Sequence, residues 1–242
     1  MEDLLIYKQK KLNGADFDNF TLNDYQVYIN LIAKIVGVDD KGNSLNPSKL
    51  KREHILTAKE FSDNFQTDLT YSYRVIKEAV DKLMKTDIKI TKLNTKDYRR
   101  INVCSQADYC AKQGKIIIRF TEEIMPYLAQ VTEKFTLYKL KEISEFKSIY
   151  SLRLYELLQD FKDTGYLIIK LESLRTSFGV GIKFKKYNDF KRKTFAHAVQ
   201  EINKHYHIDL DFQEIKEGRK VVAIKFTFNK TKIAKRYKQD GT

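Results

Sequence analysis

Apolar residues recur at helical spacing along residues 187–203, YNDFKRKTFAHAVQEIN. At about 100° per residue, one side of such a helix is apolar and the other is mostly polar. The apolar side carries Phe195, Ala198, Val199, Ile202 and Tyr206, and the other carries Lys193, Ala196, Gln200, Asn203 and Lys204. The pattern predicts one amphipathic helix that packs one face on a core and leaves the other exposed.

The same order of apolar spacings occurs in both halves of the chain. Residues 28–32, YINLI, match residues 154–158, LYELL. The spacing of Leu56, Phe61 and Phe65 returns as Ile169, Leu174 and Phe178, and that of Ala79, Val80 and Leu83 returns as Ala198, Val199 and Ile202. Each series ends in a short alternating strand. Three matches in one order predict a duplication, in which each half reads helix, short strand and helix, longer helix, then strands.

A helix-turn-helix whose third helix is followed by a β-hairpin is the layout of a winged helix. The first hairpin is expected from residues 88–94, 99–110 and 114–120, and the second from residues 208–215 and 221–229. The turn KEGRK between the last two strands contains Gly218, which relaxes the turn, and carries Arg219 and Lys220 outward. The expected fold class is therefore α+β, with two tandem winged-helix domains related by internal duplication.

The boundary between the halves is expected between Pro126 and Lys147, where no Gly or Ser linker occurs. We predict an N-terminal winged-helix domain at residues 1–130, which contacts the DNA backbone and dimerises. Residues 131–147 form a stiff, helical connecting segment in this interpretation. Residues 148–242 form the main DNA-reading winged-helix domain with a basic tail.

The net positive charge of the chain indicates which kinds of partner it binds. The chain of 242 residues carries 45 Lys and Arg against 32 Asp and Glu, a net charge of +13. This excess favours an anionic partner, with nucleic acid first and a membrane surface second. No segment approaches the roughly 18 uninterrupted apolar residues of a spanning helix. The start of the chain, acidic first and basic later, is the reverse of a secretory signal, so we expect a cytoplasmic protein.

The cysteines and glycines of the sequence indicate neither a zinc site nor a nucleotide-driven motor. The two cysteines, Cys104 and Cys110, lie six positions apart without a paired CxxC or a nearby histidine, so reduced thiols are expected. The glycines form neither GxGxxG nor GxxxxGK[ST], the usual phosphate-binding loops. We expect no cofactor, no metal and no catalytic residue.

The candidate DNA-binding residues of the second half cluster around residues 181–193. Backbone phosphates require cations, and base edges require donors that project from the same surface. We assign Arg192, Lys193, Asn188 and Gln200 as candidates for base contacts. His197 is either a phosphate donor or an exposed histidine without a role. The full set in this half is Lys185, Lys186, Asn188, Lys191, Arg192, Lys193, His197, Gln200, Arg219 and Lys220.

In the first half, the equivalent helix offers Ser72, Tyr73, Arg74 and Lys77 as phosphate contacts, although this face serves protein contacts in an alternative interpretation. Arg99 and Arg100, at the start of a wing strand, either clamp a phosphate or protect an edge strand from pairing. The basic residues of the tail, which either follow DNA or stay solvated, are Lys230, Lys232, Lys235, Arg236 and Lys238.

The sequence resembles the family of replication initiators of iteron-containing plasmids that replicate as theta forms. The resemblance rests on SIYSLRLYELLQDFKDTG, LIIKLESLRTSFGV, YNDFKRKTFAHAVQEIN and IKEGRKVVAIKFTF, and it extends from about residue 22 to residue 228. It implies two tandem winged helices, with the recognition helix of the second at residues 188–203. It also implies that monomers bind directly repeated origin sites and recruit host helicase, whereas dimers repress their own promoter.

Two rival interpretations remain open. Residues 205–207, HYH, have the His-apolar-His form that rolling-circle nicking enzymes use to hold a divalent metal. However, this motif falls where a helix ends and a strand begins, rather than in mid-strand. A transcriptional repressor without a replication role is the other alternative, because the same surfaces would bind the same kind of DNA.

Overall fold

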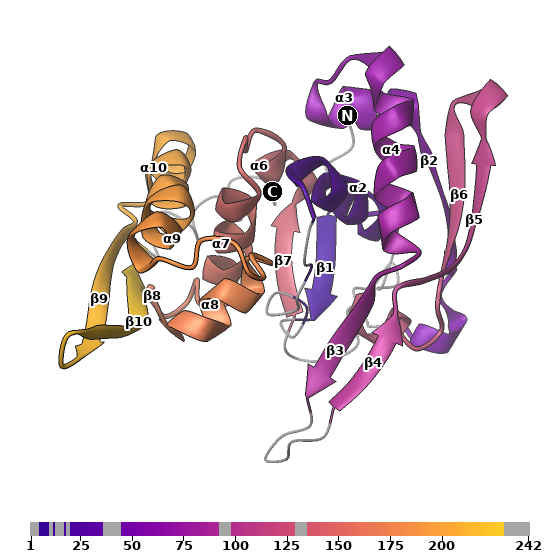
Figure 1. The fold of residues 1–242 in the computed structure, drawn as a ribbon. Helices are drawn as coiled ribbons and strands as arrows, with labels where there is room; N and C mark the ends of the chain where they lie inside the picture. The colour runs from indigo at the N-terminus through magenta and orange to yellow at the C-terminus, as the bar shows by residue number, and fades with distance from the viewer. Residues whose placement is uncertain are drawn as a thin grey trace. The chain divides into compact units, whose positions relative to one another are not determined.

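The computed structural model describes residues 5–9, 12, 17, 20–35, 45–91, 98–128 and 135–229. The chain divides into two compact units, Met1–Glu145 and Phe146–Thr242 (Figure 1). No helix among these described residues combines the length and the apolar character needed to cross a membrane.

The first unit contains a helix-turn-helix followed by an antiparallel sheet. It runs through α2 (Leu22–Ile32), β2 (Glu53–Thr57), α3 (Ala58–Phe65) and α4 (Leu69–Leu83). Gln66 ends α3 with a positive φ of 52°, and the Asp68 side chain caps α4 by accepting the Tyr71 N–H at 3.0 Å. The Asp68 carboxylate thereby satisfies one of the free N–H groups at the start of α4, so this helix start is encoded locally.

The strands that follow α4 are β3 (Asp87–Thr91), β4 (Tyr98–Asn102), β5 (Cys104–Cys110) and β6 (Lys115–Phe120). Strands β3 and β4 pair with each other, whereas β6 lies between β2 and β5 in a separate antiparallel sheet. The 3-10 turns Pro47–Lys49 and Ala111–Gln113 and the short helix α5 (Met125–Leu128) complete the connections.

The predicted single strand at residues 99–110 is wrong, because the chain breaks at Val103 into β4 and β5. Val103 and Cys104 are both buried, so two successive side chains point inward and the alternation of a regular strand is interrupted. Val103 also links the two sheets, since its N–H donates to the Thr86 carbonyl and its own carbonyl accepts from the Thr121 N–H. The ladder of β5 with β6 is irregular between Cys104 and Gln106.

The connecting segment differs from the helix expected at residues 131–147. Strand β7 (Phe135–Lys139) pairs antiparallel with β1 (Leu5–Gln9), and among the described residues of this segment, 135–147, helix α6 (Leu140–Ser144) alone is helical. The division between the units falls after Glu145, so β7 and α6 belong to the first unit. Pairing between strands so distant in sequence leaves no local signal of its own.

The second unit repeats the order of the first. It contains α7 (Ile149–Gln159), β8 (Tyr166–Lys170), α8 (Leu171–Ser177), α9 (Tyr187–Lys193) and α10 (Phe195–Tyr206), then β9 (Asp211–Glu217) and β10 (Lys220–Thr227). Strand β10 lies between β8 and β9, just as β6 lies between β2 and β5. The α+β fold of two winged helices, expected from the repeat, is confirmed.

The apolar positions that defined the repeat form the two cores, apart from Ile169, which is half-buried. In the first unit, Leu56, Phe61 and Ala79 are fully buried, and Phe65 is 4% exposed. In the second unit, the stripe of α10 is buried as predicted, namely Phe195, Ala198, Val199, Ile202 and Tyr206. Burial of these faces, rather than helix propensity, supplies most of the stability of such helices.

Residues 187–203 do not form the single helix that their spacing predicts. Thr194, with φ −122° and ψ −97°, separates α9 from α10. Its buried hydroxyl donates to the Phe190 carbonyl at 2.5 Å. In an uninterrupted helix Phe190 and Phe195 would project about 140° apart, yet both side chains are fully buried. The break therefore brings two aromatic rings into one core.

A candidate nucleic-acid interface on the second unit

A loop rich in lysine, residues 181–186, precedes α9 and is named here the basic loop. Arg175 of α8 braces it, because its guanidinium donates to the carbonyls of Lys183 at 2.7 Å and Phe184 at 3.1 Å. The same guanidinium lies 4.7 Å from the centre of the Phe190 ring. Lys183, Lys185 and Lys186 are exposed. The loop therefore presents cations from a backbone that is fixed by hydrogen bonds.

Helices α9 and α10 present a polar face beside the basic loop. Asn188 and Arg192 are one helical turn apart on α9 and both are exposed. The Arg192 guanidinium, whose side chain is 75% exposed, pairs with Asp189 at 3.2 Å. His197 and Gln200 are exposed on α10, and Lys193 of α9 lies 5.6 Å from the Phe184 ring centre. Most of the candidates assigned to this half are therefore exposed on the basic loop and the two helices that follow it.

Lys191 differs from its neighbours because it is engaged with the wing. Its ammonium donates to Glu214 Oε1 at 2.9 Å, and the Tyr187 hydroxyl donates to the same oxygen at 2.7 Å. These three residues, named here the Glu214 bridge, tie α9 to β9. The hydrogen bonds from Lys191 and Tyr187 lower the pKa of Glu214, whereas burial and the carboxylate raise the pKa of Tyr187. Glu214 is therefore ionised at neutral pH.

The wing tip carries Arg219 and Lys220 at the end of the β9–β10 hairpin (Figure 1). Glu217 pairs with Lys220, so the loop consists of Gly218 and Arg219. Gly218 has a φ of 60°, which glycine adopts without the strain that a Cβ would cause. Arg219 and Lys220 are exposed and project from a turn set apart from α9 and α10 along the hairpin.

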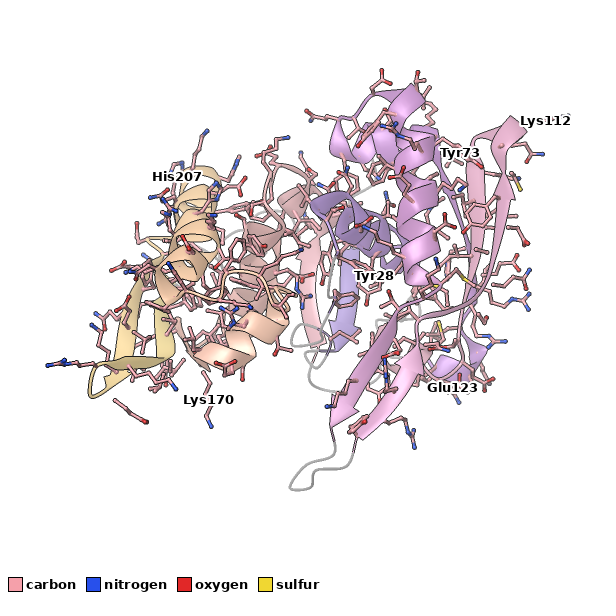
Figure 2. The ribbon with its side chains drawn as sticks, viewed as in Figure 1. Tyr28, Tyr73, Lys112, Glu123, Lys170 and His207 are labelled. Atoms are coloured by element: carbon pink, nitrogen blue, oxygen red, sulfur yellow. The ribbon has the colours of Figure 1, made fainter. Side chains whose placement is uncertain are left out.

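In the first unit, α4 carries Tyr73, Arg74 and Lys77 at its surface, with Tyr73 half-buried (Figure 2). Arg74 lies 4.7 Å from the ring centre of Tyr71, an exposed residue that the sequence reasoning missed. The sequence did contain a signal for Tyr71, because residues three positions apart on a helix are neighbours and Tyr71 precedes Arg74 by three. Lys77 pairs with Asp81 at 3.3 Å.

Ser72 does not belong to this surface, and its assignment as a phosphate contact is wrong. The side chain is fully buried, its hydroxyl donates to the Asp68 carbonyl at 2.7 Å, and it lies 2.8 Å from the Thr67 hydroxyl. Ser72 shares a helical face with Val75, Ile76 and Ala79, which are buried core residues. The spacing of these residues in the sequence already contained this information.

Arg99 and Arg100 lie on β4 and are exposed, as expected for the start of a wing strand. The Arg100 guanidinium is already engaged, because its Nε donates to Asp87 Oδ1 at 2.8 Å on the paired strand. This ion pair joins β3 to β4 and engages the Arg100 guanidinium within the protein. The basic residues of the tail, from Lys230 onward, lie outside the described residues.

His205 and His207 have structural roles at the end of α10. His207 ends the helix in a left-handed conformation with φ 49°, and Figure 2 shows it at the terminus of α10. The His205 ring contacts the Phe146 ring edge-to-face at 6.0 Å between centres. In the described part of the chain, no three His, Cys, Asp or Glu side chains are grouped so that they could hold a metal ion.

Comparisons with known proteins agree with this fold. The sequence profile described as "Initiator Replication protein, WH1" matches residues 5–159, and that described as "Initiator Rep protein, WH2" matches residues 170–228. A replication initiation protein of Escherichia coli is 24% identical over 195 residues, which are 79% of this chain and 58% of that protein. The PI protein of Escherichia coli is 27% identical over 160 residues, 59% of this chain and 52% of that protein. The chain therefore spans little more than half the length of each.

Among solved structures, the crystal structure of the Pi initiator protein in complex with iteron DNA has a similar fold. The TM-score is 0.74 at 22% identity, covering 94% of this chain and 98% of that one. The two profiles together account for both winged-helix units in the order in which they occur in the chain. The protein belongs to the family of initiator replication proteins.

Proposed function

We propose that this protein initiates plasmid replication by binding directly repeated sites in double-stranded origin DNA. The observation that carries the proposal is the exposed cationic surface formed by the basic loop and α9, in a chain of the initiator family. Family membership, and a structural relative that was crystallised with iteron DNA, support duplex DNA as the ligand.

In this proposal the second unit provides most of the sequence reading. Lys183, Lys185 and Lys186 neutralise backbone phosphates and thereby fix the register of the protein on the duplex. Arg192 and Asn188 project from the same side of α9 and are suited to guanine and adenine edges in the major groove. The wing tip, through Arg219 and Lys220, contacts the flanking backbone.

The first unit makes supporting contacts through Tyr73, Arg74, Lys77 and Arg99. Phosphate contacts of this kind add affinity without reading sequence. Deformation of the bound DNA favours opening where the duplex is easily melted, which is how binding assists initiation.

The protein also regulates its own synthesis and works with host proteins. In keeping with the family resemblance, a dimer that forms through the first unit represses the protein's own promoter, and the monomer cooperates with host replication proteins such as the helicase. The protein performs no reaction of its own and needs no cofactor. Access to plasmid DNA requires that it work in the cytoplasm.

Site selection from a library of random duplexes tests the central claim. We expect a motif spanning about two adjacent major-groove segments, bound without cleavage. Plasmids that carry several direct copies of the motif beside an A·T-rich tract should then replicate only when the protein is supplied. Nicking of either strand with Mg²⁺ or Mn²⁺, or the absence of any duplex preference, would contradict the proposal.

A further inference from the structure

A carboxylate connects the third helix to the wing in each winged-helix unit. In the second unit it is Glu214 of β9, which accepts hydrogen bonds from Tyr187 and Lys191 of α9. In the first unit it is Asp81 of α4, which accepts from Tyr109 of β5 at 2.5 Å and from Lys77 at 3.3 Å. We name Lys77, Asp81 and Tyr109 the Asp81 bridge.

The two bridges use the same three kinds of side chain in different positions. Tyrosine comes from the strand in the first unit and from the helix in the second. The repeat that aligns Ala79 with Ala198 places Asp81 opposite Gln200, so the carboxylates are not copies of one ancestral residue. The same chemical connection therefore occurs between helix and wing twice, by different routes.

Glu214 places a negative charge directly beside the Lys191 ammonium of α9. Its side chain is 20% exposed, and its second oxygen lies 3.5 Å from the Lys216 ammonium. Lys191 and Lys216 therefore share one counter-ion within the protein. A phosphate that approaches Lys191 must compete with this carboxylate and is repelled by it.

The Glu214 bridge also fixes the orientation of α9 at its N-terminal end. Phe212 and Glu214 lie on the same side of β9, and the Phe212 ring packs edge-to-face on Phe195 at 5.0 Å between ring centres. Tyr187 is the first residue of α9, so its hydrogen bond to Glu214 anchors the end of α9 next to Asn188. Fixed donors discriminate between bases, whereas a mobile lysine binds any phosphate.

We propose that Glu214 is a specificity-determining positioning residue, which restrains Tyr187 and Lys191 and reduces binding to non-cognate DNA. This inference rests on the proposed duplex-binding function and deepens it. The carboxylate lowers the affinity for random sequence and thereby raises the difference between cognate and random sequence. The Asp81 bridge performs the corresponding task for Lys77 of α4.

The test compares Glu214→Gln with Glu217→Gln in the full chain. Both variants remove one negative charge from β9, but Glu217 is exposed near the wing tip, whereas Glu214 contacts α9. Dissociation constants are measured for the selected duplex and for a scrambled duplex at several salt concentrations. Unfolding curves establish that each variant is folded.

For Glu214→Gln we expect tighter binding to scrambled DNA, by about fivefold, and a salt slope steeper by about 0.9, because Lys191 becomes free to neutralise one more phosphate. The ratio of selected to scrambled affinity should fall by about fivefold or more, the size of one displaced base contact. Glu217→Gln should strengthen binding to both duplexes by a similar factor, about twofold, and keep the ratio.

Tyr187→Phe provides a second variant that keeps every charge. It should lower the affinity ratio by about threefold without changing the salt slope, because only the hydrogen bond that positions α9 is lost. Equal effects of Glu214→Gln and Glu217→Gln on the ratio, or a uniform loss of binding to both duplexes, would overturn the inference. Failure of the proposed function would instead appear as no discrimination by the unmodified protein.

Discussion

The rings of Phe190 and Phe195 lie 5.6 Å apart between centres and meet at 65°, although the two residues flank a break in the helical path. The break at Thr194 places both rings in the core of the second unit, and it thereby sets the direction of α9 relative to α10. Because the candidate base-reading residues lie on both helices, this aromatic pair determines how Arg192 and Gln200 are presented together.

The buried hydroxyl of Thr194 should stabilise this arrangement. Thr194→Val keeps the shape of the side chain and removes the hydrogen bond to the Phe190 carbonyl. We expect the free energy of unfolding to fall by about 1 kcal/mol, measured by denaturant titration. Thr227→Val on β10, whose side chain is half-buried outside the core, serves as the control and should change stability little. An unchanged stability of Thr194→Val would show that the hydroxyl does not support the break.

Arg192 and Lys186 should affect DNA binding in different ways. Arg192→Ala should cost about 1–3 kcal/mol in binding to the selected duplex and relax the preference at one base position, because a bidentate base contact is lost. Lys186→Ala should weaken binding to all sequences and reduce the salt slope by about one unit. Titrations on selected and random duplexes separate the two outcomes. If both variants weaken both duplexes equally, α9 is not the reading helix.

The brace formed by Arg175 should matter for binding although Arg175 makes its contacts within the protein. Arg175→Lys keeps the positive charge but cannot donate to both loop carbonyls in the same geometry. We expect amide exchange in the basic loop to accelerate and DNA affinity to fall by about threefold to tenfold. Lys170→Arg, at the end of β8, provides a control with the opposite exchange of cations. Unchanged exchange in the loop would show that Arg175 does not hold it.

The first unit should lose stability when the pH falls. Burial of His54 lowers its pKa below 6.5, and the ring lies 2.8 Å from the Lys51 carbonyl through Nε2. The unfolded chain then binds the proton more tightly, so the contribution is complete above pH 6.5 and is lost as the pH falls toward the lower pKa of the folded state. Melting temperatures at pH 7.5 and pH 5 measure this effect. His54→Gln should reduce the difference between them, and an identical difference would contradict the assignment.

Much of the candidate site was accessible from the sequence because its residues are close together in the chain. The run from Lys183 to Lys193 and the wing tip at Arg219 are local features, and spacing alone separated the apolar stripe of α10 from its polar face. Ser72 was assigned to the surface by residue type, although its spacing with Val75 and Ala79 indicated burial. Glu214 went unnoticed because the alternation of β9 shows which side it occupies but does not identify its partners.

The sequence by itself determined the tandem winged helices, the order of their elements and the segment that carries the cationic surface, because hydrophobic periods of 3.6 and 2 record which face each element buries. Only the tertiary structure decided the break at Thr194, the division of the strand at Val103 and the two bridges. Tyr109 and Asp81 are 28 positions apart, and Tyr187 and Glu214 are 27 apart. Contacts at such separations depend on how the helix packs against the sheet, and no local pattern encodes that packing.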